Sequence, residues 1–293
     1  MKKVTFGMLV VTLVLFLGLN IFTDPIVANT VDKNYNQRDI YLNIMTCNKI
    51  QYNLVREIAG DKHNVEFMFN NNEESKDFRY TEETISNISN MDLFIYSGNE
   101  YEPWSKDLID HLKKGNLGII NISRGMKKLT IESEEGTKEN PYYWTGLDEY
   151  KVELHNIKNA IQDRDPKNRN IYEENYNSAV HNLEYKLGKI KENKESIDNY
   201  EFISLDSSLG YLYRTLGINP INISKDESLE RVISQYDVKN KKILILKDKD
   251  TDLDLTGYDN VVEFNKFNDE FLADKLLVDN YKSFYYQIQN LKK

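Results

Sequence analysis

The sequence has one cysteine, Cys47, among its 293 residues, so an internal disulfide is excluded. Cys47 also lies far beyond the apolar N-terminal run, which is not where a lipoprotein carries its acylated cysteine. We therefore interpret it as a small buried hydrophobic residue. Histidine is almost as scarce, and its four copies are scattered singly over predicted loops and helices. We expect these histidines to be surface residues rather than metal ligands, and they are His63, His111, His155 and His181.

Motifs of enzyme chemistry are absent from the sequence as well. It has no Gly-rich phosphate loop, no HExxH and no nucleophile paired with a base in a diagnostic motif. Glycine is sparse at the predicted helix starts. Lys76, Tyr142 and Asp206 can be drawn as a catalytic set, but no motif supports it. We predict that the protein is not an enzyme.

The N-terminus carries the one long apolar run. Lys2 and Lys3 precede residues 4–22, which hold no charged side chain and are nearly long enough to span a membrane. This pattern predicts an export signal or a membrane anchor in residues 1–28, with the rest of the chain outside the cytoplasmic membrane. Ala28 suits a cleavage site, but Ile26 at the minus-three position does not, so cleavage and retention as an anchor both stay open.

The charge balance limits the partners. Removing residues 1–28 takes away two lysines and one aspartate, so the formal net charge goes from -9 to -10 (-9 - 2 + 1). A chain this acidic is not expected to bind nucleic acid or anionic lipid as its main partner. The roughly 265 residues that remain are enough for two ordinary domains or one large domain.

Short β-branched runs alternate with segments of helical period, which predicts an α/β fold with mostly parallel sheets. In the first part the expected strands are residues 40–46, 65–69, 92–96 and 118–122. Asn48 can cap a helix after the first strand, and Gly60 can end it. In the second part the expected strands are residues 201–205, 220–223, 242–247 and 261–264, and a final helix carries an apolar face over residues 281–291.

A long helix is expected between the two parts. Asp165 and Pro166 supply a cap and a first-turn proline, and apolar residues then recur at three- and four-residue steps from Tyr172 to Ile190. The prediction is an N-terminal α/β lobe at 37–164, a rigid connecting helix at 165–195 and a C-terminal α/β lobe at 196–293. Ligands of such sheets lie beyond the carboxyl ends of the strands, so we expect the ligand cleft between the lobes.

Five segments, in this order, resemble the solute-binding proteins of zinc and manganese ABC importers. They are residues 50–62 (IQYNLVREIAGDK), 92–104 (DLFIYSGNEYEPW), 140–144 (NPYYW), 165–172 and 208–217 (SLGYLYRTLG). The likeness covers essentially the whole exported part, and it lies in the position of the segments rather than in composition. It implies an extracytoplasmic binding protein at the cell surface or in the periplasm, monomeric, with an ABC permease as partner. Contact with the membrane follows only if the N-terminal segment is retained.

The resemblance also implies an ion held by three histidines, the third sometimes Glu, and by an acidic residue near the last strand of the C-terminal lobe. At each of the four matched positions this sequence has a different residue from the one that the resemblance implies. The positions are Lys76, Tyr142, Asp206 and a fourth near Asn265. Asp269 could serve if the fourth match shifts. We take Glu74, Arg79, Tyr143 and Asp269 as secondary candidates for the cleft, and Asp206 as the first candidate for any metal ligand.

These substitutions argue against zinc or manganese, the cargo that the resemblance implies. Zinc sites need imidazole, thiolate or carboxylate donors, and a lysine ammonium has no lone pair to give. Our hypothesis is that Lys76 and Asp206 form an internal ion pair closed over by Tyr142, in place of the ion.

Three functions stay open at this point. The first is an importer's solute-binding protein with a degenerate metal site, receiving an anionic or aromatic molecule through Lys76, Arg79, Tyr142, Tyr143 and Trp144. For Trp144 in particular, core packing is the stronger interpretation. The second is weak binding of manganese or calcium through oxygen ligands from Asp206, Asp269 and Glu74. The third is a non-transport surface protein of the adhesin type that retains the fold.

Overall fold

The computed structural model describes residues 39–70, 73–133, 136–192, 197–223, 228–236 and 242–290. It divides into two compact units between Ile40 and Tyr41, and the description below concerns the larger one. The expected export segment at residues 4–22 lies outside the described residues. No helix in the described ranges is both long and apolar enough to cross a membrane. The lobe boundaries expected at 164 and 195 stay predictions.

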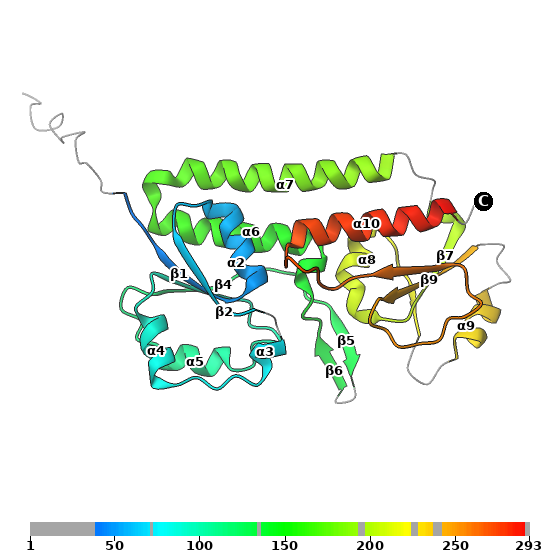
Figure 1. Cartoon of the computed structure of the whole chain (residues 1–293), viewed down its shortest axis with the longest axis horizontal. Coiled ribbons are helices and arrows are strands. Elements are labelled where there is room, and N and C mark those ends of the chain that lie inside the picture. Colours follow the sequence, from blue (N-terminus) through cyan, green and yellow to red (C-terminus); the bar gives the residue numbers. More distant parts are fainter. Residues whose placement is uncertain are drawn as a thin grey trace, which may run out of the picture. The chain divides into compact units, whose positions relative to one another are not determined.

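The first sheet has four parallel strands in the order β2-β1-β3-β4 (Figure 1). The strands are β1 Asn43–Asn48, β2 Asn64–Phe69, β3 Leu93–Tyr96 and β4 Gly118–Asn121. The helices around them are α2 Lys49–Ala59, α3 Glu73–Lys76, α4 Glu82–Ser89 and α5 Ser105–His111. Asn48 caps α2 as expected, because its side chain accepts the N–H of Gln51, and Gly60 ends the helix with a φ of 59°.

The second sheet is also parallel, in the order β10-β9-β7-β8. Its strands are β7 Tyr200–Ser204, β8 Ile221–Asn222, β9 Lys242–Asp248 and β10 Val261–Phe264. The helices are α8 Gly210–Leu216, α9 Leu229–Tyr236 and α10 Ala273–Asn290, with 3-10 turns η4 Ile197–Asn199 and η5 Ser207–Leu209. An antiparallel hairpin, β5 Thr130–Ser133 with β6 Gly136–Glu139, projects between the two sheets and was not expected (Figure 1).

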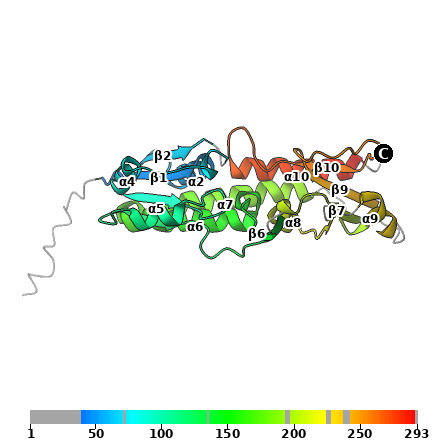
Figure 2. The ribbon, with the colours of Figure 1, turned by 90° about the horizontal axis from the view of Figure 1, so that it is seen from below.

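Two long helices link the sheets. The expected one is α7, Arg169–Glu192, which follows the 3-10 turn η3, Pro166–Asn168. It runs beside α10 in both views, and it also contacts α2 (Figures 1 and 2). The other is α6, Leu147–Arg164, which sequence reasoning missed. Helix α6 buries polar side chains on its packed face, so a search for apolar periodicity does not find it; they are Glu149, Glu153, Lys158 and Gln162.

A buried hydrogen-bond network fixes the start of α7. The Tyr172 hydroxyl donates to Asp165 Oδ2 at 2.5 Å and lies 2.8 Å from His63 Nε2. His63 Nδ1 accepts the N–H of Leu42 at 3.3 Å, so the ring proton belongs on Nε2. His63 is buried, which corrects our expectation of a surface histidine, and burial lowers its pKa.

One apolar cluster runs through both sheets and the helices between them, from Leu42 just before β1 to Ile288 in the last helix. Cys47 is fully buried, as expected, in a second cluster under the first sheet. Continuity of the core explains why residues 41–293 form a single compact unit.

Helix α6 carries two carboxyl groups into this core. Glu149 and Glu153 are each 2 % exposed, and one oxygen of each, Oε2, has no hydrogen-bond partner among the described residues. Burial raises the pKa of Glu149 to about 7, against the opposing charge of Arg214. Burial, with the charges of Glu149 and Glu102, raises the pKa of Glu153 to about 8. Both groups therefore hold protons in the folded chain at a pH where free carboxyls have lost them.

These raised pKa values predict that the fold is most stable in mild acid. Below about pH 4.5 both the folded and unfolded chains are protonated. As the pH rises to 7–8, only the unfolded chain ionises, so each carboxyl lowers the free energy of unfolding by about 1.4 kcal/mol per pH unit. Thermal unfolding of the full chain in detergent at pH 5, 6, 7 and 8 measures the effect.

Glu153→Gln removes the contribution of one carboxyl to the pH dependence of stability, so we expect Tm to fall less steeply between pH 5 and pH 8. The exposed Glu83→Gln is the matched control and should leave the slope unchanged. A Tm that rises from pH 5 to pH 8 contradicts the prediction.

Candidate ligand cleft

The four matched positions lie at the ends of elements. Lys76 is the last residue of α3, and Tyr142 directly precedes the 3-10 turn η2, Tyr143–Thr145. Asp206 lies two residues after β7 and directly precedes the 3-10 turn η5, in which Ser208 donates its N–H to the Asp206 side chain. Asn265 directly follows β10. Asp206 and Asn265 thus stand beyond the carboxyl ends of parallel strands, where ligands of α/β sheets are found.

Contacts connect three of these positions, Lys76, Tyr142 and Asp206, into one row across the two sheets. The Lys76 ammonium lies 4.8 Å from the centroid of the Tyr101 ring, and the Tyr101 hydroxyl donates to the Tyr142 hydroxyl at 2.9 Å. The Tyr142 ring in turn lies 4.9 Å from the ammonium of Lys266. Sequence reasoning missed Tyr101 and Lys266, although Tyr101 lies within the matched segment 92–104 and Lys266 directly follows Asn265.

Asp206 forms its ion pair with Lys266, whereas we had expected an ion pair with Lys76. The Lys266 Nζ lies 3.0 Å from Asp206 Oδ2, 3.3 Å from Asp248 Oδ2 and 3.3 Å from Ser208 Oγ. Burial lowers the pKa of Lys266. Its interactions with Tyr142, Asp206 and Asp248 raise the pKa by more, so the pKa lies above its ordinary value. Lys266 is therefore charged at neutral pH.

Asp248 is the second acid at this centre and was not a candidate from sequence. It ends β9, is 2 % exposed, and its Oδ1 has no hydrogen-bond partner among the described residues. Burial raises its pKa, and the Lys266 charge opposes that shift. The charge cluster, by which we mean Asp206, Asp248, Ser208 and Lys266, therefore combines two carboxyl groups with one ammonium.

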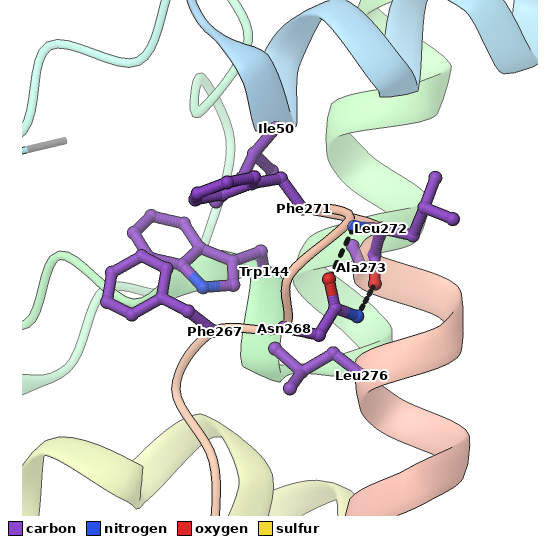
Figure 3. Close-up of a pocket in the computed structure, with 8 residues that line it drawn as sticks. All are labelled: Ile50, Trp144, Phe267, Asn268, Phe271, Leu272, Ala273 and Leu276. Atoms are coloured by element: carbon purple, nitrogen blue, oxygen red, sulfur yellow. Dashed lines mark hydrogen bonds between the residues drawn. The ribbon is translucent and has the colours of Figure 1, made fainter. Parts of the chain in front are cut away.

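Aromatic rings close the cleft beside the charge cluster. Figure 3 shows the rings of Trp144, Phe267 and Phe271 gathered on one side of a pocket that Ile50 and Leu276 also line, and the space between them admits no water molecule. Trp144 is 4 % exposed, in line with core packing. Its indole N–H donates to the backbone carbonyl of Lys266 at 2.7 Å. Lys266 is thus held at both its side chain and its backbone.

The remaining candidates lie elsewhere or make other contacts. Asn265 exchanges two backbone hydrogen bonds with the Asn280 side chain, both 2.9 Å long. Asp269 is exposed, and so is Glu74, which accepts the N–H of Asn70 at 3.2 Å. Tyr143 is buried and bonds Glu139. Arg79 lines a separate pocket of about 490 Å³ with Phe78, Tyr80, Trp104 and Asp107.

The donors present do not fit a transition-metal ion. Within the described ranges, no group of three or more His, Cys, Asp or Glu side chains is placed to hold a metal. At the charge cluster the only such donors are the carboxylates of Asp206 and Asp248, and both face an ammonium. Zinc sites use three or four nitrogen, sulfur or oxygen donors in tetrahedral array.

The hydrogen bond from Trp144 predicts a cost when its donor is removed. Trp144→Phe leaves the Lys266 carbonyl without its indole partner, so we expect the free energy of unfolding to fall by about 1–3 kcal/mol in urea titrations. The exposed Tyr286→Phe is the control and should change it by less than about 0.5 kcal/mol. Equal unfolding midpoints for Trp144→Phe and the unmodified chain contradict the prediction.

Comparison with known proteins adds a family match. The model of the family described as "Zinc-uptake complex component A periplasmic" matches residues 44–249. The high-affinity zinc uptake system protein ZnuA of Bacillus subtilis is 25% identical over 194 residues, which are 62% of this chain and 61% of that protein. The manganese ABC transporter substrate-binding lipoprotein scaA of Streptococcus gordonii is 27% identical over 205 residues, 68% and 63% of the two chains. The chain thus spans less than two thirds of the length of these relatives.

Solved structures share the fold. A metal-free mutant of the periplasmic metal binding protein from Candidatus Liberibacter asiaticus has a TM-score of 0.63 at 19% identity, covering 84% of this chain and 99% of its own. The SBP FpvC from Pseudomonas aeruginosa in complex with Mn²⁺ has a TM-score of 0.63 at 16% identity, covering 86% and 100%. At these identities the likeness establishes the architecture and not the ligand.

Proposed function

The chain belongs to the family described as zinc-uptake complex component A, and from this premise we propose that it is the extracytoplasmic solute-binding component of a metal-type ABC importer with a degenerate metal site. Its partner is then the permease of that importer, and its role is binding rather than catalysis. The relatives' names, which refer to uptake of zinc and manganese, support the role in transport.

The observation that carries the proposal is the row of contacts from Lys76 to Asp206. Three of the four positions that the resemblance matches to ion ligands, Lys76, Tyr142 and Asp206, are linked here in one row of contacts through Tyr101 and Lys266. These positions therefore remain linked to one another, although their side chains are not the donors that the resemblance implies. A protein that had only kept the fold would not need these positions to stay in contact.

The chemistry of the row argues against a bare divalent cation as cargo. An added ion near Asp206 would stand next to the Lys266 ammonium, 3.0 Å from the same carboxylate. Two like charges about 4 Å apart repel by roughly 4 kcal/mol per charge product at an effective dielectric of 20, and a divalent ion doubles that product. The aromatic faces of Tyr101 and Tyr142 supply no compensating donors of the kind that zinc prefers.

The test asks what the protein carries and whether it takes up metal. Full-length protein purified in detergent from its own host is examined by native mass spectrometry and elemental analysis, and then titrated with Zn²⁺ and Mn²⁺ in a calorimeter at micromolar concentration. We expect no stoichiometric, sub-micromolar isotherm for either ion, because the charge cluster already holds a cation.

A variant with a single tryptophan gives a fluorescence signal that reports binding in the cleft only. The sequence has two tryptophans, so Trp104→Phe leaves Trp144, beside Lys266, as the only indole reporter. A solute that binds in the cleft should change its fluorescence, and Trp144→Phe with Trp104 retained should not respond. A tight zinc isotherm accompanied by a Trp144 signal would sink the degenerate-site proposal.

A further inference from the structure

We propose that the pocket around Arg79 is a second binding site, which takes a zwitterionic α-amino acid with an aromatic or large apolar side chain. The inference goes beyond the proposed function, because no residue that lines this pocket belongs to the row from Lys76 to Asp206. The pocket measures about 490 Å³, and small-molecule sites commonly occupy about 300–1,000 Å³. Two oppositely charged and three aromatic side chains line it, and they are Arg79, Asp107, Phe78, Tyr80 and Trp104.

The aromatic side of the pocket is a fixed part of the fold. Trp104 directly precedes α5, and its indole N–H donates to the backbone carbonyl of Ser75 in α3 at 2.8 Å. The Phe78 ring meets the Trp104 ring edge-to-face with centroids 5.2 Å apart, and Phe69 packs against both rings. Trp104 is buried, whereas Phe78 and Tyr80 are half-buried. These rings offer apolar surface to the side chain of a ligand.

Arg79 brings a cation without an acidic partner to this wall. Its side chain is exposed, and its Nη1 donates to the backbone carbonyl of Phe78 at 3.3 Å. Within the described ranges, no carboxylate forms an ion pair with it. A guanidinium group can bind a carboxylate through two parallel hydrogen bonds. We therefore assign the carboxylate of the ligand to Arg79.

Asp107 brings the opposite charge and is oriented by Tyr80. The Tyr80 hydroxyl donates to Asp107 Oδ2, which raises the pKa of Tyr80 to about 12, so this hydroxyl stays a donor at neutral pH. Asp107 Oδ1 accepts no hydrogen bond from the part of the chain that the structure describes. His111 Nδ1 lies 4.0 Å from Oδ1 and donates to the Asp107 backbone carbonyl at 2.8 Å. Oδ1 is thus available to the ammonium of a ligand.

The two charges select a molecule that carries both signs. Arg79 and Asp107 line the same pocket, yet they form no ion pair with each other. A simple anion at Arg79 would be repelled by Asp107, and a simple cation at Asp107 would be repelled by Arg79. An α-amino acid carries its carboxylate and its ammonium on one carbon atom, so it can bind both residues while its side chain packs against the rings.

The experiment uses Trp104 as the reporter. Trp144→Phe leaves Trp104, which lines the pocket, as the only tryptophan. This full-length variant in detergent is titrated with L-phenylalanine, and only the indole is excited. We expect a saturable change of fluorescence with a Kd on the order of 1 mM or tighter, as for a small ligand in an open pocket. The analogues 3-phenylpropionate, which lacks the ammonium, and 2-phenylethylamine, which lacks the carboxylate, should bind at least about tenfold more weakly.

Matched variants assign the binding to the two charged residues. Arg79→Gln and Asp107→Asn, each combined with Trp144→Phe, should weaken the binding of L-phenylalanine at least about tenfold. Arg124→Gln and Asp252→Asn make the same changes at exposed residues outside the pocket and should leave the Kd unchanged. The absence of a saturable response to L-phenylalanine overturns the proposal. Equal affinity for either analogue, or an unchanged Kd in either pocket variant, overturns it as well.

A second measurement covers the case in which Trp144→Phe does not fold. L-phenylalanine at about 10 mM should raise the Tm of the unmodified chain by about 3 °C, because a ligand at ten times its Kd stabilises the folded state by mass action. The same concentration of 3-phenylpropionate should raise it less. Equal Tm values with and without L-phenylalanine overturn the proposal. The proposed function is tested by metal isotherms and by Trp144, so either inference can fail while the other stands.

Discussion

Packing around helix α6 is the constraint on which both sheets depend. The helix contacts α2 and β4 of the first sheet, α8 and α10 of the second, and α7 along its length. No strand is shared between the sheets, so their relation rests on side-chain packing against these helices. Because α6 also carries Glu149 and Glu153 into the core, the cohesion of the two sheets is tied to the protonation of buried carboxyls.

Local signals in the sequence predicted the parts of the fold whose cause is local. Asn48 before the first helix and Gly60 after it act locally, and the structure confirms both. Pro166, expected in the first turn of the long helix, instead opens the 3-10 turn η3 before it, and Asp165 makes no side-chain capping bond there. The β-branched runs likewise identified all eight strands of the two parallel sheets, with ends displaced by up to three residues. Helix α6 was missed because tertiary packing, and not its own apolar period, buries its polar side chains.

Sequence reasoning placed Asp206 and Asn265 directly after predicted strands, but it did not predict which side chains meet there. The structure has both residues beyond the carboxyl ends of β7 and β10, as parallel topology requires. The lysine that pairs with Asp206 comes from a segment far away in sequence, and the sequence alone does not distinguish Lys76 from Lys266 as that partner. The register that aligns β7, β9 and β10 brings Lys266 to Asp206. Asp248 was missed because it lies at the end of a strand and its nearness to Asp206 also depends on this register.

The lysine in the charge cluster has a consequence at the level of the gene. Lysine and glutamate codons differ by a single base, so one mutation at position 266 would exchange the ammonium for a third carboxylate beside Asp206 and Asp248.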